Sequence, residues 1–177
     1  MVELYLRSPL GHRGADLARI DAVEVAHLAQ IDVRCSVEDA ARLGFPIEPN
    51  TVTGDASRGV LWLAPDEWLV VGLPGTAQAL TADLEQAVEG SHHAVVDVSA
   101  NRAVVEMRGA NRHDLLASGC GLDLDPAGGW FPGRCAQTLF ARAQVILQEM
   151  EGATRVFVRP SFANYVVDRL SAARSPG

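Results

Sequence analysis

Lysine is absent from this sequence of 177 residues, so all 15 basic side chains are arginines. Against them stand 22 acidic residues, which gives a net charge of −7 at neutral pH. A surface of this sign repels phosphate backbones and anionic lipid head groups unless basic residues cluster locally. The sequence contains no such cluster, so its composition argues against binding to nucleic acid or to a membrane.

Cysteine is also scarce, and Cys35, Cys120 and Cys135 form neither a CxxC pair nor a metal-ligand spacing. An odd number of cysteines is unlike the disulfide framework of a small secreted protein. The N-terminal residues lack the basic and then apolar build of a signal peptide, and no apolar run approaches the length of a membrane span. We therefore expect a cytoplasmic protein with reduced cysteines.

The rest of the composition is that of an ordered globular protein, with 48% hydrophobic and 21% charged residues. A chain of this length can bury most of its apolar surface in a single domain. Within that domain, over residues 1–177, we distinguish an N-terminal arm over 1–22, a first half over 23–90 and a second half over 91–174.

The two halves share one order of predicted elements. In the first half, alternating polarity predicts a strand over 23–34, and helical spacing predicts a short helix after Ser36. A Pro- and Gly-rich loop over 45–59 precedes two strands joined by a turn at 64–67, and a helix starts at Thr76. The second half repeats this order with strands at 95–98, 103–107, 135–142, 145–150 and 154–158, and with helices at 110–118 and after Pro160. The pattern predicts an α+β fold of two similar β-α-β-β-α halves with mainly antiparallel sheets.

Residues that carry chemistry are few. The sequence has no Gly-rich phosphate loop, no GxSxG elbow, no HExxH and no EF-hand. His92 and His93 are adjacent, and neighbours on a strand point to opposite faces, so they are poorly placed to chelate one ion. Cys135 and His113 could form a nucleophile and base if they met in space, but an inert buried cysteine is far commoner. We expect no catalytic, cofactor-binding or metal-binding residue in this chain.

Asp97 stands within an apolar strand and just before a polar corner of the chain. Its structural role would be to accept hydrogen bonds from that corner or to pair with Arg102, and its functional role would be that of a general base or ligand anchor. We favour the structural role, because buried carboxylates are ordinarily paired in this way.

Aromatic residues offer a second ambiguity, because tryptophan in a strand usually belongs to the core but is also enriched at interfaces. Trp62 and Trp68 lie in predicted strands, whereas Trp130 and Phe131 lie in a loop. The loop pair is therefore the better candidate for contact with a partner protein.

Four segments, in this order and spacing, carry a family resemblance: LWLAPDEWLVVG, DVSANRAVVEMRGANRHDLLASGCGLDLDP, FPGRCAQTLFARAQVIL and VRPSFANYVVDRL. Over about Leu61 to Leu170 the sequence resembles the gamma subunit family of heterotetrameric sarcosine oxidase. The resemblance implies a fold similar to the folate-binding domain of the glycine-cleavage aminomethyltransferase.

The same resemblance implies partner chains called alpha, beta and delta. Together they form an oxidoreductase complex that demethylates sarcosine to glycine, with hydrogen peroxide and either formaldehyde or methylene-tetrahydrofolate as the other products. It implies FAD, FMN, NAD and tetrahydrofolate in the alpha and beta chains, zinc in delta, and no cofactor in gamma.

Aminomethyltransferases anchor the folate amine with an acidic residue in a Gly-rich turn, whereas the corresponding segment 140–145 has neither a carboxylate nor a glycine. We therefore expect a non-catalytic structural subunit. An independent folate-binding or folate-dependent one-carbon transfer protein, and a self-associating scaffold, remain alternatives. The candidate contacts, chosen by residue type and loop position, are Trp130, Phe131, Arg102, Arg142 and Arg159, with Asp97 and Arg102 as a structural corner.

Overall fold

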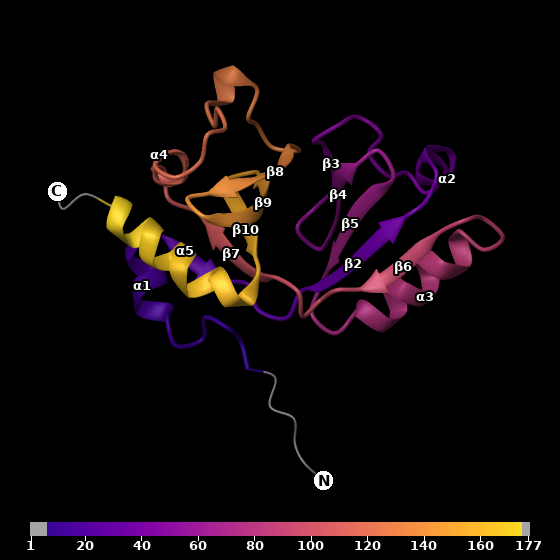
Figure 1. Cartoon of the computed structure of the whole chain (residues 1–177), viewed down its shortest axis with the longest axis horizontal. Helices are drawn as coiled ribbons and strands as arrows, with labels where there is room; N and C mark the ends of the chain where they lie inside the picture. Colours follow the sequence, from indigo (N-terminus) through magenta and orange to yellow (C-terminus); the bar gives the residue numbers. More distant parts are fainter. Residues whose placement is uncertain (1–6, 175–177) are drawn as a thin grey trace, which may run out of the picture.

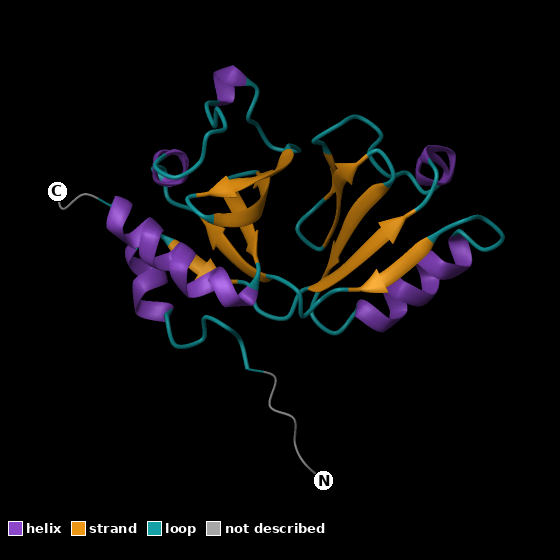
Figure 2. Cartoon of the chain, in the orientation of Figure 1, coloured by secondary structure: helices purple, strands orange, loops and turns teal. Residues whose placement is uncertain are grey.

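Two antiparallel five-stranded sheets form the centre of the molecule, and helices cover the outer face of each (Figures 1 and 2). The computed structural model describes residues 7–174. The first sheet has the strand order β3-β4-β5-β2-β6, and the second has the order β1-β7-β10-β9-β8. The layers therefore run helix, sheet, sheet, helix, which confirms the α+β class and the antiparallel pairing predicted above.

The first sheet and its helices are formed by residues 29–97. Ser36 caps α2 as predicted, because its Oγ accepts a hydrogen bond from the Asp39 backbone N–H at 3.1 Å. The turn predicted at 64–67 and the helix predicted after Thr76 are confirmed. The elements are β2 (Ala29–Arg34), α2 (Val37–Arg42), β3 (Val52–Gly54), β4 (Arg58–Ala64), β5 (Glu67–Gly72), α3 (Ala77–Ala87) and β6 (Ala94–Asp97).

The second sheet and its helices come from the N-terminal segment and from residues 103–173. The predicted strands and the helix after Pro160 are confirmed, while the helix expected over 110–118 is shorter. The elements are α1 (Gly14–Arg19), β1 (Ala22–Glu24), β7 (Ala103–Met107), α4 (Arg112–Ala117), the 3₁₀ turn η1 (Pro126–Gly128), β8 (Cys135–Phe140), β9 (Ala143–Met150), β10 (Ala153–Val158) and α5 (Pro160–Ala173).

The prediction of one strand over 23–34 is wrong. The segment forms β1 and β2, which belong to different sheets, and His27 between them has a φ of 61°, which extended backbone does not adopt. Polarity alternates at the same parity on both sides of this break, so the sequence pattern continues through it. A short strand, β3, also lies within the segment predicted as a loop.

The strand exchange is reciprocal. β1 pairs with β7, placing Val23 opposite Glu106 in the second sheet, whereas β6 pairs with β2, placing Val95 opposite Val33 in the first. Each sheet thus takes one strand from across the division predicted between residues 90 and 91. The two halves are joined by sheet pairing as well as by the chain.

Apolar side chains form three layers. The layer between the sheets contains Leu61, Leu69, Ile146 and Phe157, none of them more than 2% exposed. A second layer lies between the first sheet and α2 and α3, and a third lies between the second sheet and α1, α4 and α5. Each fully buried side chain of this size stabilises the fold by about 1.5–3 kcal/mol. Over residues 7–174, no helix combines the length and the apolar character needed to span a bilayer.

Candidate functional site

A buried carboxylate organises the loop between α4 and β8. Glu149 of β9 accepts hydrogen bonds from Arg112 Nη2 at 2.8 Å, from Trp130 Nε1 at 2.9 Å and from the Thr154 hydroxyl, and His113 Nε2 lies 3.1 Å away. The Glu149 side chain is 1% exposed, so leaving its carboxylate without these partners would destabilise the folded state. We call these five residues the Glu149 network.

The network fixes the position of the predicted interface pair. Trp130 is only 6% exposed, because its ring packs into the core and its N–H reaches Glu149, whereas the next residue, Phe131, is 46% exposed. The structure thus places Trp130 in the interior and leaves Phe131 on the surface. Sequence reasoning missed this network, although a glutamate inside the apolar run of β9 signalled a need for buried donors.

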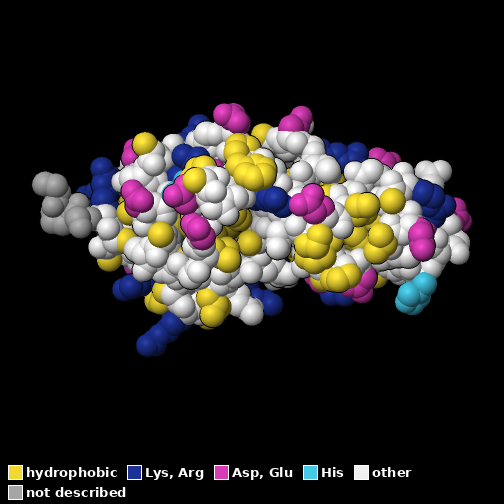
Figure 3. Space-filling model, turned by 90° about the horizontal axis from the view of Figure 1, so that it is seen from above, with side chains coloured by type: hydrophobic (Ala, Val, Ile, Leu, Met, Phe, Trp, Pro, Cys, Tyr) yellow, Lys and Arg dark blue, Asp and Glu magenta, His cyan; other side chains and the backbone are white. Residues whose placement is uncertain are grey.

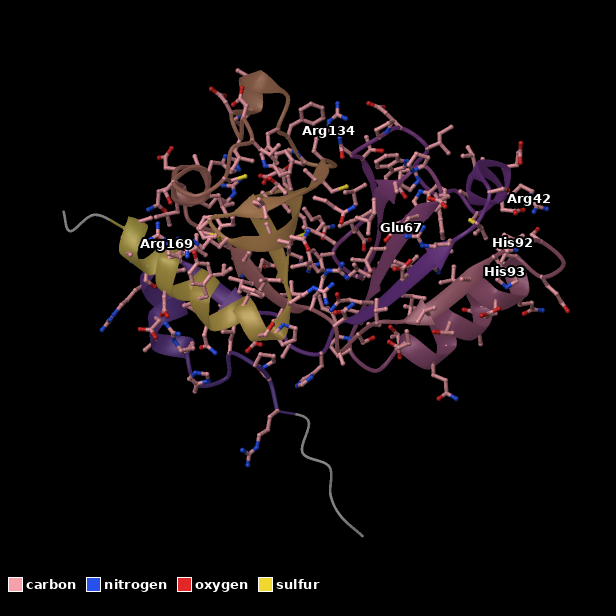
Figure 4. All side chains as sticks on the ribbon, in the orientation of Figure 1. Arg42, Glu67, His92, His93, Arg134 and Arg169 are labelled. Atoms are coloured by element: carbon pink, nitrogen blue, oxygen red, sulfur yellow. The ribbon has the colours of Figure 1, made fainter. Side chains whose placement is uncertain are left out.

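Arg134 connects the loop that carries Phe131 to the first half. Its guanidinium lies 4.9 Å from the centroid of the Phe131 ring, and its Nη1 donates to Glu48 at 3.1 Å. Backbone hydrogen bonds also join the two halves here, from Val52 N to Gly133 O at 2.8 Å and from Cys135 N to Asn50 O at 2.9 Å. Figure 4 shows Arg134 at the rim between the two halves.

Exposed apolar side chains flank this junction. Ile47 is 58% exposed on the first half, beside Glu48, and Phe131 is exposed on the second. We call Ile47, Glu48, Phe131 and Arg134 the rim patch. Seen from above in Figure 3, hydrophobic side chains gather on this face of the molecule with charged groups between them. Aromatic and arginine side chains of this kind are enriched where proteins bind one another.

A second buried ion pair lies between the sheets. Glu106 of β7 and Arg155 of β10 stand directly opposite in the strand register, and Arg155 Nε donates to Glu106 at 3.0 Å. Burial would raise the pKa of Glu106, but hydrogen bonds from Arg108 and Arg155 and their charges hold it below its usual value. The pair shares the face of the second sheet that carries Val104 and Phe157, toward the first sheet.

The corner after β6 is stabilised by Asp97, but without help from the Arg102 side chain. Asp97 Oδ1 accepts hydrogen bonds from Ser99 N at 2.9 Å and Ser99 Oγ at 2.5 Å. The Arg102 backbone oxygen instead accepts from Gln30 Nε2 at 3.0 Å, and no ion pair joins Asp97 to Arg102 in the part of the chain described. Asp97 is also exposed, so the predicted burial of its carboxylate is wrong.

The three candidate arginines do not form one surface. Arg102 and Arg159 line the same cavity of about 290 Å³, next to β8 and β9. Arg142 is exposed in the tight turn between β8 and β9, where Ala141 has a φ of 54°, and it does not line that cavity.

The candidate nucleophile and metal residues serve other roles. Burial raises the pKa of the Cys135 thiol to about 12, and Sγ lies 3.4 Å from the Thr51 and Trp62 carbonyl oxygens, while His113 contacts Glu149 instead. His93 Nε2 lies 2.9 Å from Glu85. Residues 7–174 contain no group of three His, Cys, Asp or Glu side chains that could hold a metal ion.

Comparison with known proteins gives consistent matches. The model of the family described as "Sarcosine oxidase, gamma subunit family" matches residues 22–175. The sarcosine oxidase subunit gamma of an Arthrobacter species is 29% identical over 96% of this chain and 92% of that protein. That of Corynebacterium sp. strain U-96 is 32% identical over 96% of this chain and 90% of its own length.

Solved structures extend this similarity to three dimensions. A chain of heterotetrameric sarcosine oxidase from Corynebacterium sp. U-96, in complex with pyrrole 2-carboxylate, aligns with a TM-score of 0.85 at 30% identity over 94% of this chain and 93% of that one. The glycine cleavage system aminomethyltransferase T from Bartonella henselae aligns with a TM-score of 0.65 at 15% identity, over 92% of this chain and 49% of that one. The second alignment shows a shared fold.

Proposed function

The chain belongs to the sarcosine oxidase gamma subunit family, and from this premise we propose that it is a non-catalytic subunit that holds the other chains of the complex in place. The rim patch is its proposed docking surface. The supporting observation is the Glu149 network. Glu149 and its four partners hold Trp130 in the core and so fix the loop that presents Phe131. A fixed aromatic side chain loses little conformational entropy when it binds, which favours affinity.

The chemistry-bearing side chains of the described chain support a non-catalytic role. Glu149 and His113 stabilise the loop, Cys135 is buried as a thiol, and Glu106 is paired with Arg155. Each of these groups already has partners within the fold. His113 also lines a cavity with Asp114 and Asp123, but its Nε2 lies 3.1 Å from the buried Glu149 carboxylate.

We propose alpha, beta and delta chains as the partners, because the related structure is a heterotetramer by its description. In this proposal FAD, FMN, NAD and tetrahydrofolate belong to alpha and beta and zinc belongs to delta, while this chain contributes contact surface. We also propose a cytoplasmic location, since all three cysteines are buried and unbridged.

A folate-binding role is disfavoured at the position where aminomethyltransferases carry their acidic anchor. The turn between β8 and β9 presents Ala141 and Arg142, so the amine of a pterin would lack a carboxylate partner there. Titration calorimetry of the chain with tetrahydrofolate tests this, and micromolar binding would favour the folate-dependent alternative.

Co-expression with the partner chains tests the docking surface. We expect Phe131→Asp to reduce recovery of the assembled complex in size-exclusion chromatography, because it places a charge at the centre of the patch. Phe162→Asp on α5 is the matched control, since Phe162 is similarly exposed, at 42%, but lies outside the rim patch. Loss of assembly with Phe162→Asp alone would assign docking to the α5 face and refute the proposed surface.

A further inference from the structure

We propose that the cavity lined by Arg102 and Arg159 is a binding site for a carboxylate group. The pairing of β7 with β10 brings the two arginines to this cavity. The β7–β10 ladder ends at the pair Ala103 and Val158, so Arg102 and Arg159 follow it at the same end of the sheet, where both line the cavity. Like charges close together on neighbouring strands destabilise a sheet. A bound anion between them would remove that cost.

The lining of the cavity matches this assignment. The eight lining residues come from the ends of four neighbouring strands and include no aspartate or glutamate: Arg102, Gln137, Thr138, Leu139, Gln144, Val145, Ile146 and Arg159. The chain as a whole carries a net charge of −7. The wall of this cavity thus contributes two positive charges and no carboxylate, unlike the chain as a whole.

Arg102 has no counter-ion within bonding distance in residues 7–174, and its side chain forms no ion pair there. Burial, and then the charge of Arg159, lower the pKa of Arg102, while the charges of Asp32 and Glu67 act in the opposite direction. Glu67, labelled in Figure 4, instead binds Arg34 at 2.7 Å. The Arg102 guanidinium thus keeps its hydrogen-bond donors for another partner.

The ligand class follows from the groups present. A guanidinium binds a carboxylate with two parallel hydrogen bonds, and a pair of guanidiniums can hold it from both sides. Val145, Ile146 and Leu139 provide apolar wall for a short methylene stem, and Gln144 provides a neutral amide. A cavity of about 290 Å³ accommodates an acid of amino-acid size. The carboxylate can belong to a small organic acid or to a glutamate side chain of another subunit, and the second source depends on the proposed function.

The first arm of the test uses the isolated full-length chain and sodium glutarate as the probe, at constant ionic strength. Backbone amide signals of residues 137–146 should shift with saturable binding. Arg102→Gln or the exposed Arg159→Gln should weaken binding by about tenfold or more. Arg169→Gln, which removes the same charge from α5 outside the cavity (Figure 4), should leave binding within about twofold.

The second arm co-expresses the same variants with the partner chains and measures assembly by size-exclusion chromatography. If the carboxylate comes from another subunit, Arg102→Gln and Arg159→Gln reduce assembly, Arg169→Gln does not, and glutarate competes with assembly of the wild type. Failure of the wild-type chain to assemble would refute the subunit role and leave the first arm to decide the site.

The two arms together decide the proposal. Arginine-dependent binding of glutarate with no effect on assembly assigns the site to a small acid, and arginine-dependent assembly assigns it to a partner side chain. Glutarate shifts that are equal in all variants, or an absence of both effects, would overturn the carboxylate site. Thermal unfolding of each variant confirms that the comparison is made between folded chains.

Discussion

Replacing Glu149 by glutamine tests whether the buried network holds the rim patch in place. The substitution keeps the side-chain shape but removes the negative charge and turns one acceptor oxygen into a donor. Trp130 and Thr154 donate to one carboxylate oxygen, and Arg112 donates to the other, which His113 Nε2 also contacts. An amide nitrogen would therefore face either Trp130 and Thr154 or Arg112 and His113. Either orientation leaves a buried donor without an acceptor.

The size of the effect follows from burial. The side chains of Glu149 and Arg112 are 1% and 16% exposed, so neutralising one leaves the other as a nearly buried charge. Breaking a buried pair costs about 3–5 kcal/mol, and the retained hydrogen bonds favour the lower end, about 3 kcal/mol. For a chain of this length each kcal/mol lowers the melting temperature by about 2–4 °C, so we expect a decrease of about 6–12 °C.

Urea unfolding followed by circular dichroism measures this loss. Glu151→Gln, the same change at an exposed position in the following turn, should alter the unfolding free energy by less than about 0.5 kcal/mol. A double-mutant cycle of Glu149→Gln with Trp130→Phe should give a coupling energy of about 1 kcal/mol or more. A Glu149→Gln chain within about 1 kcal/mol of wild type, or an uncoupled cycle, would refute the role given to the network.

Three further predictions follow from the buried and corner groups. Burial raises the pKa of Cys135 to about 12, so the folded state keeps a proton that the unfolded chain loses above about pH 9. The free energy of unfolding should therefore fall as pH rises from about 9 to 12. Cys135→Ala should flatten that slope in urea unfolding. The pKa of Glu106 is lowered in the folded state, so its contribution to the free energy of unfolding is complete above its usual pKa. That contribution should be lost as pH falls through the folded value. Glu106→Gln should remove this dependence from acid titrations of unfolding. Asp97→Ala should lower the free energy of unfolding by about 1 kcal/mol, because the corner loses its hydrogen bonds to Asp97. A double-mutant cycle with Arg102→Ala should show a coupling energy below about 0.5 kcal/mol, and a larger value would support the predicted ion pair.

Local sequence signals predicted most elements because each depends on neighbours along the chain. Ser36 placed before an apolar stripe predicted α2, and Pro65 and Asp66 predicted the β4–β5 turn. The same logic failed at His27. A period of two in polarity does not specify the sheet that a strand joins, and in β1 it does not give burial either, since Val23 is 46% exposed and Ala22 is 4% exposed.

Partnerships between distant residues could not be predicted in the same way. Residue type singled out Trp130 and Phe131 together, but only the fold shows that one ring binds Glu149 inside while the other is exposed. Arg102 and Arg159 were candidates by residue type and loop position. Their meeting depends on the register of β7 with β10, which no local pattern specifies.

The sequence by itself determined the fold class, the order of nearly all helices and strands, and the family, because periodicity, caps, turns and motif spacing are properties of neighbouring residues. Tertiary structure alone decided the exchange of β1 and β6 between the sheets, the burial of Trp130 and the pairing of two arginines at one cavity. These depend on strand register and on which donors reach a buried carboxylate, and both are set by contacts between residues tens of positions apart.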